Sequence, residues 1–164
     1  MIISNNLIGK MPIPDDAIIR INLAWFKTKE EAEKVIIGCK NVYLDYPDGR
    51  SKPPRPKISL VEAIELSKLD NVSYFAISNV EDVLKIKELQ EQVGKPIVPK
   101  IETKKGVEII EELIEIGIDM IMLDKEDLYT NVDCDSFLYT LLIDKVRTYG
   151  SQIKILELQG VVFI

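Results

Sequence analysis

The stretch from residue 97 to residue 130 constrains the fold more than any other part of this 164-residue chain. It begins with a short apolar run at residues 97–101, followed by apolar residues at helical spacing over 107–114, and Gly117 ends that helical pattern. A second apolar run covers residues 118–123. Such runs are typical of parallel strands that are buried on both faces. We therefore predict one βαβ unit here.

Polar side chains follow both predicted strands of this unit. Lys100 and Glu102 stand at the end of the first strand, and Asp124, Glu126 and Asp127 follow the second. Because side chains alternate along a strand, residues 100 and 102 are expected on the same face. In α/β folds the carboxyl ends of the strands are where ligands bind. These residues are therefore the candidate site.

The rest of the chain continues the alternation of strands and helices. A short first strand is expected at Ile2-Ile3, and further strands at residues 17–25, 42–45, 72–78 and 153–158. Helix starts are predicted at serine or threonine followed three residues later by glutamate: Thr28 with Glu31, Ser59 with Glu62, and Ser78 with Glu81. A last helix is expected to start at Asp133 or Asp135, and Gly160–Ile164 reads as an apolar tail. The pattern predicts a single α/β domain over residues 1–164.

Composition excludes several classes of protein. A net charge of −6 argues against nucleic acid or an anionic membrane as the main partner. No apolar run approaches the ~20 residues of a membrane span, and the first residues lack the pattern of a signal peptide. Cys39 and Cys134 lie in no metal-binding pattern, so we expect two buried free thiols in a cytoplasmic protein.

Histidine is absent from the sequence. This excludes mechanisms that use a histidine base, and it excludes histidine-ligated zinc. A bound metal would have oxygen ligands, which favours Mg²⁺ or Mn²⁺.

The central unit resembles the catalytic barrel of pyruvate kinase. The matching motifs are Lys100-Ile101-Glu102, Gly106-Val107 and Glu126-Asp127-Leu128. Ile101-Glu102-Thr103 also resembles the strand end of the related HpcH/HpaI and citrate-lyase β aldolases of the phosphoenolpyruvate/pyruvate superfamily. The resemblance implies that Glu102 and Asp127 bind Mg²⁺ or Mn²⁺, and that Lys100 is catalytic and offsets charge on a pyruvate-like enolate. The alternative is that each carboxylate only stabilises a helix N-terminus.

Two further matches to pyruvate kinase lie before the central unit. Residues 17–25 resemble its Arg-Leu-Asn strand, which implies a catalytic Arg20 at the phosphate end of the site and a substrate-binding Asn22. Asp45 matches an aspartate that helps to hold a monovalent cation, so it is a candidate substrate-binding residue and a candidate ligand of K⁺. The alternative for Arg20 is a salt bridge across the barrel mouth.

The resemblance implies a reduced or incomplete TIM-type (β/α) barrel with parallel strands. A complete barrel typically needs ~250 residues, so we expect an open edge in this chain. An open edge invites pairing, and it would be completed by a homo-oligomer or partner chain, be covered locally, or reflect a shortened chain. Residues 48–56 form a loop where pyruvate kinase carries its lid domain, and Glu126 replaces a glycine of that family.

Two main functions are open at this point, and true pyruvate kinase activity is a third that ranks last, because it needs the lid and the glycine that this chain lacks. The first is a divalent-metal enzyme that acts on a 2-oxo acid or phosphoenolpyruvate-like ligand through an enolate, as a carbon–carbon lyase or a related enzyme. The second is a non-catalytic pyruvate kinase-like domain used for binding, regulation or assembly. The retained Lys100, Glu102 and Asp127 favour the first, and the missing lid favours the second.

Overall fold

The computed structural model describes residues 1–10, 12–49, 53–159 and 162–164. The strands within these ranges are β1 (Ile2–Ser4), β2 (Ile18–Asn22), β3 (Val42–Tyr46), β4 (Val72–Ile77), β5 (Ile97–Ile101), β6 (Met120–Leu123), β7 (Lys154–Gln159) and β8 (Val162–Phe163). The helices are α1 (Lys29–Ile37), α2 (Leu60–Ser67), α3 (Val83–Val93), α4 (Lys104–Glu108), α5 (Ile110–Glu115), α6 (Lys125–Asn131) and α7 (Ser136–Thr148). Short 3₁₀ helices are η1 (Asn5–Leu7), η2 (Leu23–Trp25) and η3 (Tyr149–Ser151).

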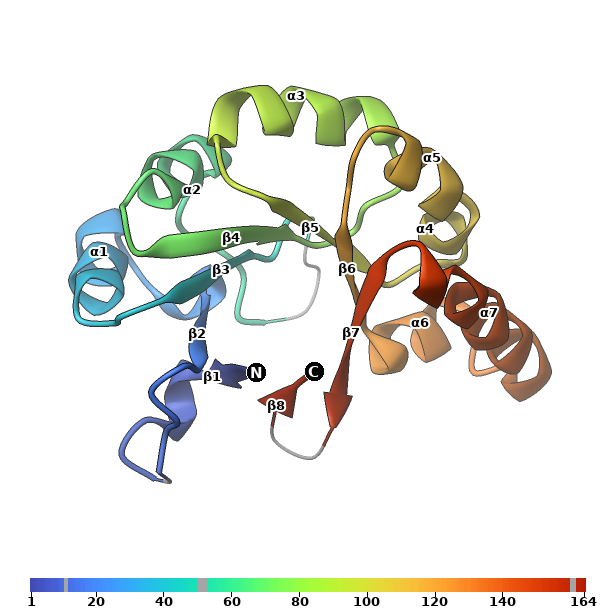
Figure 1. Ribbon diagram of the computed structural model, residues 1–164, viewed down its shortest axis with the longest axis horizontal. Helices are drawn as coiled ribbons and strands as arrows, with labels where there is room; N and C mark the ends of the chain where they lie inside the picture. Colours follow the sequence, from blue (N-terminus) through green and yellow to red (C-terminus); the bar gives the residue numbers. More distant parts are fainter. Residues whose placement is uncertain (11, 50–52, 160–161) are drawn as a thin grey trace.

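The strands form a closed barrel in chain order (Figure 1). Each strand from β1 to β7 is parallel to the next. The short β8 is antiparallel to both β7 and β1 and lies between them. This confirms the reduced TIM-type barrel. Of the alternatives expected for the barrel edge, local covering is the one that the structure shows, because β8 of the same chain pairs with both β1 and β7.

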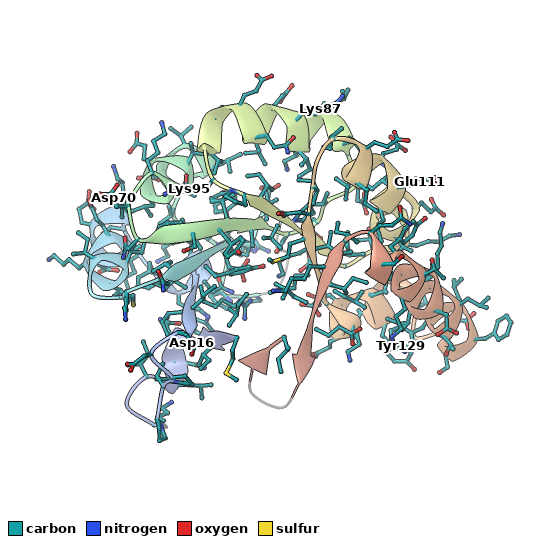
Figure 2. The ribbon with its side chains drawn as sticks, viewed as in Figure 1. Asp16, Asp70, Lys87, Lys95, Glu111 and Tyr129 are labelled. Atoms are coloured by element: carbon teal, nitrogen blue, oxygen red, sulfur yellow. The ribbon has the colours of Figure 1, made fainter. Side chains whose placement is uncertain are left out.

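Apolar side chains fill two separate spaces. Inside the barrel they stack in one cluster, formed by Ile2, Tyr43, Ala76, Val98, Met120, Met122 and Leu156. A larger cluster lies between the strands and the outer helices. The helices turn their charged faces to solvent, as Lys87 of α3 and Glu111 of α5 show (Figure 2). Because side chains alternate along a strand, Lys100 lies on the same inner face as Val98, and Asp124 on the same inner face as Met122. These two polar residues therefore lie nearer the carboxyl ends of β5 and β6.

Helix starts agree only partly with the sequence prediction. Ser59 and Glu62 form the expected capping box of α2. Asp82, not Ser78, caps α3, and its side chain accepts a hydrogen bond from the backbone of Leu84. The predicted helix over residues 107–114 is interrupted at Ile109, which separates α4 from α5. Because Asp82 caps α3, the Ser78 side chain is not used as a helix cap and contacts Lys100 instead.

Three further predictions from the sequence can be compared with the structure. β2 ends at Asn22, so the last three residues of the strand predicted over 17–25 form η2 instead. The prediction of two buried thiols is wrong, because Cys39 is partly exposed and Cys134 is exposed. Among the described residues, no helix is both long enough and apolar enough to cross a membrane.

Candidate functional site

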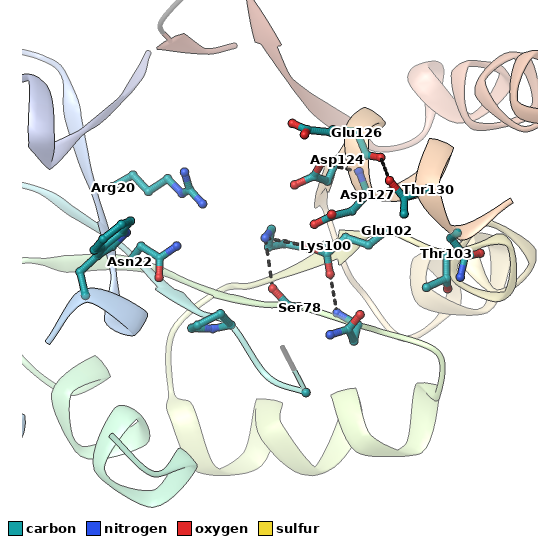
Figure 3. Close-up of a pocket in the computed structure, with 15 residues that line it drawn as sticks. Arg20, Asn22, Ser78, Lys100, Glu102, Thr103, Asp124, Glu126, Asp127 and Thr130 are labelled. Carbon is teal, nitrogen blue, oxygen red and sulfur yellow. Dashed lines mark hydrogen bonds and ion pairs between the residues drawn. The ribbon is translucent and has the colours of Figure 1, made fainter. Parts of the chain in front are cut away.

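A cavity of about 530 Å³ opens at the carboxyl ends of the barrel strands (Figure 3). Arg20 and Asn22 line one side of it, and Glu102, Asp124 and Asp127 line the opposite side (Figure 3). The full lining is Arg20, Asn22, Trp25, Pro47, Gly49, Ser78, Asn79, Lys100, Glu102, Thr103, Asp124, Glu126, Asp127, Thr130 and Asn131. The position follows from parallel topology, which brings the carboxyl ends of all these strands to one face.

Lys100 and Glu102 form a buried ion pair in the wall of the cavity. Lys100 Nζ lies 2.8 Å from Glu102 Oε1, and the two side chains are 6% and 5% exposed. The pair forms because Lys100 of β5 and Glu102, directly after that strand, point to the same side, as alternation predicted. A buried ion pair of this kind is costly unless further hydrogen bonds satisfy its remaining groups.

The segment after β4 supplies those further hydrogen bonds. Lys100 Nζ donates to Ser78 Oγ at 3.1 Å. The backbone N–H of Asn79 donates to Glu102 Oε2 at 2.7 Å. Asn79 has a φ of 53°, a left-handed conformation that asparagine adopts more readily than most residues. Its side-chain Nδ2 donates to the carbonyl of Asp48 at 2.6 Å, which fixes this segment against the loop after β3.

The two members of the ion pair respond differently to burial. Burial raises the pKa of Glu102, and the Lys100 ammonium and the Asn79 N–H offset only part of that rise. Burial alone would lower the pKa of Lys100, but the carboxylates of Asp45 and Glu102 outweigh it and raise that pKa. Lys100 is therefore a cation at neutral pH. Because the pKa of Glu102 is raised, a metal ion that binds Glu102 would compete with a proton for its carboxylate.

Arg20 and Asp45 form a second buried ion pair on the other side of the barrel. Arg20 Nε donates to Asp45 Oδ2 at 2.8 Å, and its Nη2 contacts the same oxygen. Burial opposes the charge of Arg20, but the Asp45 carboxylate dominates together with its hydrogen bond and raises the pKa of the guanidinium. Asp45 is fully buried and does not line the cavity. Its predicted contact with substrate or K⁺ stays a prediction, and the contact shown is with Arg20.

Three carboxylates meet where β5 and β6 end. Glu102, Asp124 and Asp127 each offer an oxygen, and these oxygens lie within 4.8 Å of one another. Asp124 is the N-cap of α6, and its Oδ1 accepts a hydrogen bond from the backbone N–H of Asp127 at 3.2 Å. The first turn of α6 thus places both aspartates beside Glu102. An all-oxygen donor set at this spacing fits Mg²⁺ or Mn²⁺.

The structure brings most of the predicted site residues together. Arg20, Asn22, Lys100, Glu102 and Asp127 all line the one cavity. Asn22 is partly committed to the backbone, because its Oδ1 accepts from Ala24 N at 2.9 Å. Sequence reasoning missed Ser78 and Asn79, whose bonds to Lys100 and Glu102 span 22 and 23 residues of sequence. It noted the acidity of Asp124, but the cap that sets its position became visible only in the structure.

Comparison with known proteins supports the resemblance. Over 72 residues the sequence is 47% identical to pyruvate kinase from Thermotoga maritima. The chain contains a segment homologous to pyruvate kinase. The match covers 41% of this chain and 15% of the pyruvate kinase, so the chain corresponds to a small part of that enzyme. No protein-family model matches the sequence.

Most of the chain also matches a solved structure. The crystal structure of macrophomate synthase superposes with a TM-score of 0.59 at 14% identity, over 87% of this chain and 62% of that chain. At this identity the match shows a shared fold. The fold of macrophomate synthase agrees with the reduced α/β barrel described above.

Proposed function

We propose that this barrel binds a divalent metal and acts on a 2-oxo acid or phosphoenolpyruvate-like ligand through an enolate, by carbon–carbon cleavage or a related step. The observation that carries the proposal is the buried Lys100–Glu102 pair beside two more carboxylates in one cavity. The segment homologous to pyruvate kinase supports it, since that relative is named for pyruvate.

Glu102, Asp124 and Asp127 are the residues that would hold Mg²⁺ or Mn²⁺. Their carboxylate oxygens are the ligands that these ions prefer, and their spacing of at most 4.8 Å suits a single ion. When bound, the ion supplies Lewis-acid polarisation of the oxygens of a 2-oxo acid. Glu102 needs the charged form for this role, and its contacts with Lys100 and Asn79 N–H favour that form.

Lys100 and Arg20 are the cations available to an anionic ligand. The raised pKa of Lys100 keeps its ammonium charged, so it stabilises developing enolate charge and does not act as a base at neutral pH. Arg20 lines the other side of the cavity, and Asp45 holds its guanidinium in place. A ligand with a second anionic group would reach Arg20 across the mouth, which fits phosphoenolpyruvate-like or dicarboxylate ligands.

A second candidate is a binding domain without turnover. The observation that favours it is the short connection between β3 and α2, at residues 47–59, whose described residues form no lid domain over the cavity. Enzymes that transfer phosphoryl groups depend on positioning and on exclusion of water. An open mouth suits reversible binding of a metal–acid complex, and it makes pyruvate kinase activity the weakest of the alternatives.

Thermal unfolding with Mn²⁺ and oxalate tests metal-dependent ligand binding directly. Oxalate mimics the enolate of pyruvate and would bind only to the native site. At about a hundred times the dissociation constant, the melting temperature should rise by about 5–10 °C. The rise should require both Mn²⁺ and oxalate and should be absent in Glu102→Gln.

Glu111→Gln is the matched control, because it makes the same chemical change on the exposed face of α5. This variant should keep the full shift. A wild-type protein that shows no shift at millimolar-order Mn²⁺ and oxalate would contradict the metal-dependent proposal. Assays for cleavage or decarboxylation of 2-oxo acids then separate the enzyme from the binding domain.

A further inference from the structure

The cavity is larger than a three-carbon acid requires. Its volume of about 530 Å³ lies within the range of ~300–1,000 Å³ that is usual for ligands of drug size. The carboxylates that would hold the metal end of a ligand lie directly after β5 and at the start of α6, on one side only. A substrate that filled the cavity would therefore carry an extension away from its acid head.

Trp25 and Pro47 mark where that extension would lie. Trp25 follows β2, which is four strands from β6 in the barrel order, so it lies across the mouth from the two aspartates. Pro47 follows the neighbouring β3, two strands before β5. Apart from Gly49, every other side chain that lines the cavity is polar or charged. The cavity thus has an acidic side that suits a metal and a far side where an aromatic ring and a proline stand beside the polar Arg20 and Asn22.

An exposed aromatic side chain alone is ordinary on a protein surface. Trp25 is 70% exposed, and among the exposed large hydrophobic side chains of the described residues it alone lines this cavity. The backbone turn that carries Trp25 is held from within the site. Asn22 Oδ1 accepts from Ala24 N and so caps η2, the single turn that ends at Trp25.

We propose that Trp25 and Pro47 form a subsite for a carbon-rich arm, aromatic or branched, on the 2-oxo acid substrate. The inference rests on the proposed function, because it takes the acid head to be held on the side of Glu102. The arm would lie over the indole ring, and burying that surface would favour substituted 2-oxo acids over pyruvate itself.

A pair of ligands with the same head tests the subsite. Oxamate offers a carboxylate and an amide carbonyl, and N-phenyloxamate adds one phenyl ring to that head. With Mn²⁺ present, calorimetry should show the wild-type protein binding N-phenyloxamate about tenfold more tightly than oxamate. The preference should fall to about twofold or less in Trp25→Ala and return in Trp25→Phe.

Phe137→Ala is the matched control. Phe137 is 76% exposed on α7 and does not line the cavity, so its removal should leave the tenfold preference unchanged.

Trp25 is the one tryptophan of the sequence, so its fluorescence should respond to N-phenyloxamate more than to oxamate. Oxamate binding without any preference for the phenyl ligand, or a preference that survives Trp25→Ala, would overturn the subsite and leave the proposed function standing. If neither ligand binds with Mn²⁺, the proposed function fails, and the subsite fails with it.

Discussion

At the scale of single residues, Asp124 has two roles that one substitution can separate. Its Oδ1 caps α6, and it is also one of the three carboxylates near the proposed metal. Asparagine caps a helix as well as aspartate does, so Asp124→Asn should leave the melting temperature of the metal-free protein within about 2 °C of wild type. Loss of one negative charge should weaken Mn²⁺ binding by about tenfold. Electron paramagnetic resonance of free Mn²⁺ measures the dissociation constant.

Asp127→Asn and Glu102→Gln provide the comparison for this variant. Both should weaken Mn²⁺ binding at least as strongly, because these residues lie in the same cluster. An unchanged dissociation constant in Asp124→Asn, with losses in the other two variants, would restrict the metal ligands to the pair predicted from the sequence.

Tyr43 gives the fold a dependence on alkaline pH. The side chain is fully buried in the barrel interior, and burial together with the Asp45 carboxylate raises its pKa well above the usual range. In the unfolded chain a tyrosine ionises near pH ~10. The native state therefore holds the proton where the unfolded state releases it, so this residue lowers stability as pH rises above ~10, by about 1.4 kcal/mol per pH unit.

Tyr43→Phe removes this dependence. Urea unfolding at pH 7 should show a change of less than about 1.5 kcal/mol, since the hydroxyl has only a weak 3.8 Å contact with Met122 Sδ. At pH 11 the variant should be more stable relative to wild type than it is at pH 7, by about 1.4 kcal/mol. Equal losses of stability in the two proteins between these pH values would show that Tyr43 ionises in the native state.

At the scale of elements, the contact between α4 and the segment after β4 is unusually close. A Cβ on Gly106 would lie 2.9 Å from the carbonyl oxygen of Val80, which is closer than side chains normally allow. Gly106→Ala should therefore move α4 away from this segment and lower the free energy of unfolding by about 1–3 kcal/mol. The same shift would disturb the Asn79 bond to Glu102 and weaken Mn²⁺ binding.

Gly38→Ala is the control for this substitution. Gly38 ends α1 with a φ of −72°, and a Cβ there would meet its nearest neighbour at an ordinary 3.5 Å. Alanine should be neutral there or stabilise by about 0.4–1 kcal/mol. Chemical denaturation of both variants measures the difference, and equal stabilities would show that α4 adapts to the added methyl group without cost.

The elements also show what the sequence could predict. The central βαβ unit and the shared face of Lys100 and Glu102 follow from periodicity, which is a local property. The Ser78–Lys100 and Asn79–Glu102 bonds join separate strands, and the sequence signal at Ser78 favoured a helix cap that Asp82 supplies instead. Where two residues compete for one cap, the surrounding packing decides, and that information is not local.

At the scale of the whole molecule, β8 explains how so short a chain closes a barrel. Standard TIM barrels use ~250 residues and eight parallel strands. Here the described residues between β1 and β2 form only η1, and the last strand, β8, has two residues. A two-residue strand has no recognisable periodicity, so the sequence predicted only an apolar tail. The antiparallel pairing of β8 with β7 and β1 takes the place of a complete helix and a parallel strand.

Removal of residues 160–164 tests whether β8 holds the barrel closed. The deletion removes the ladders to β1 and β7, including the bonds between the backbones of Glu157 and Ile164 at 2.8 and 3.1 Å. At roughly 0.5–1.5 kcal/mol for each lost hydrogen bond, the free energy of unfolding should fall by about 2–4 kcal/mol. The exposed edges of β1 and β7 would then pair between molecules, so size-exclusion chromatography should show more self-association than in wild type.

Deletion of Ile164 alone should have a smaller effect, because the paired residues of β8 remain. If the longer deletion left both the stability and the elution volume unchanged, the seven parallel strands would be sufficient for the fold, and β8 would cover an edge without supporting the barrel.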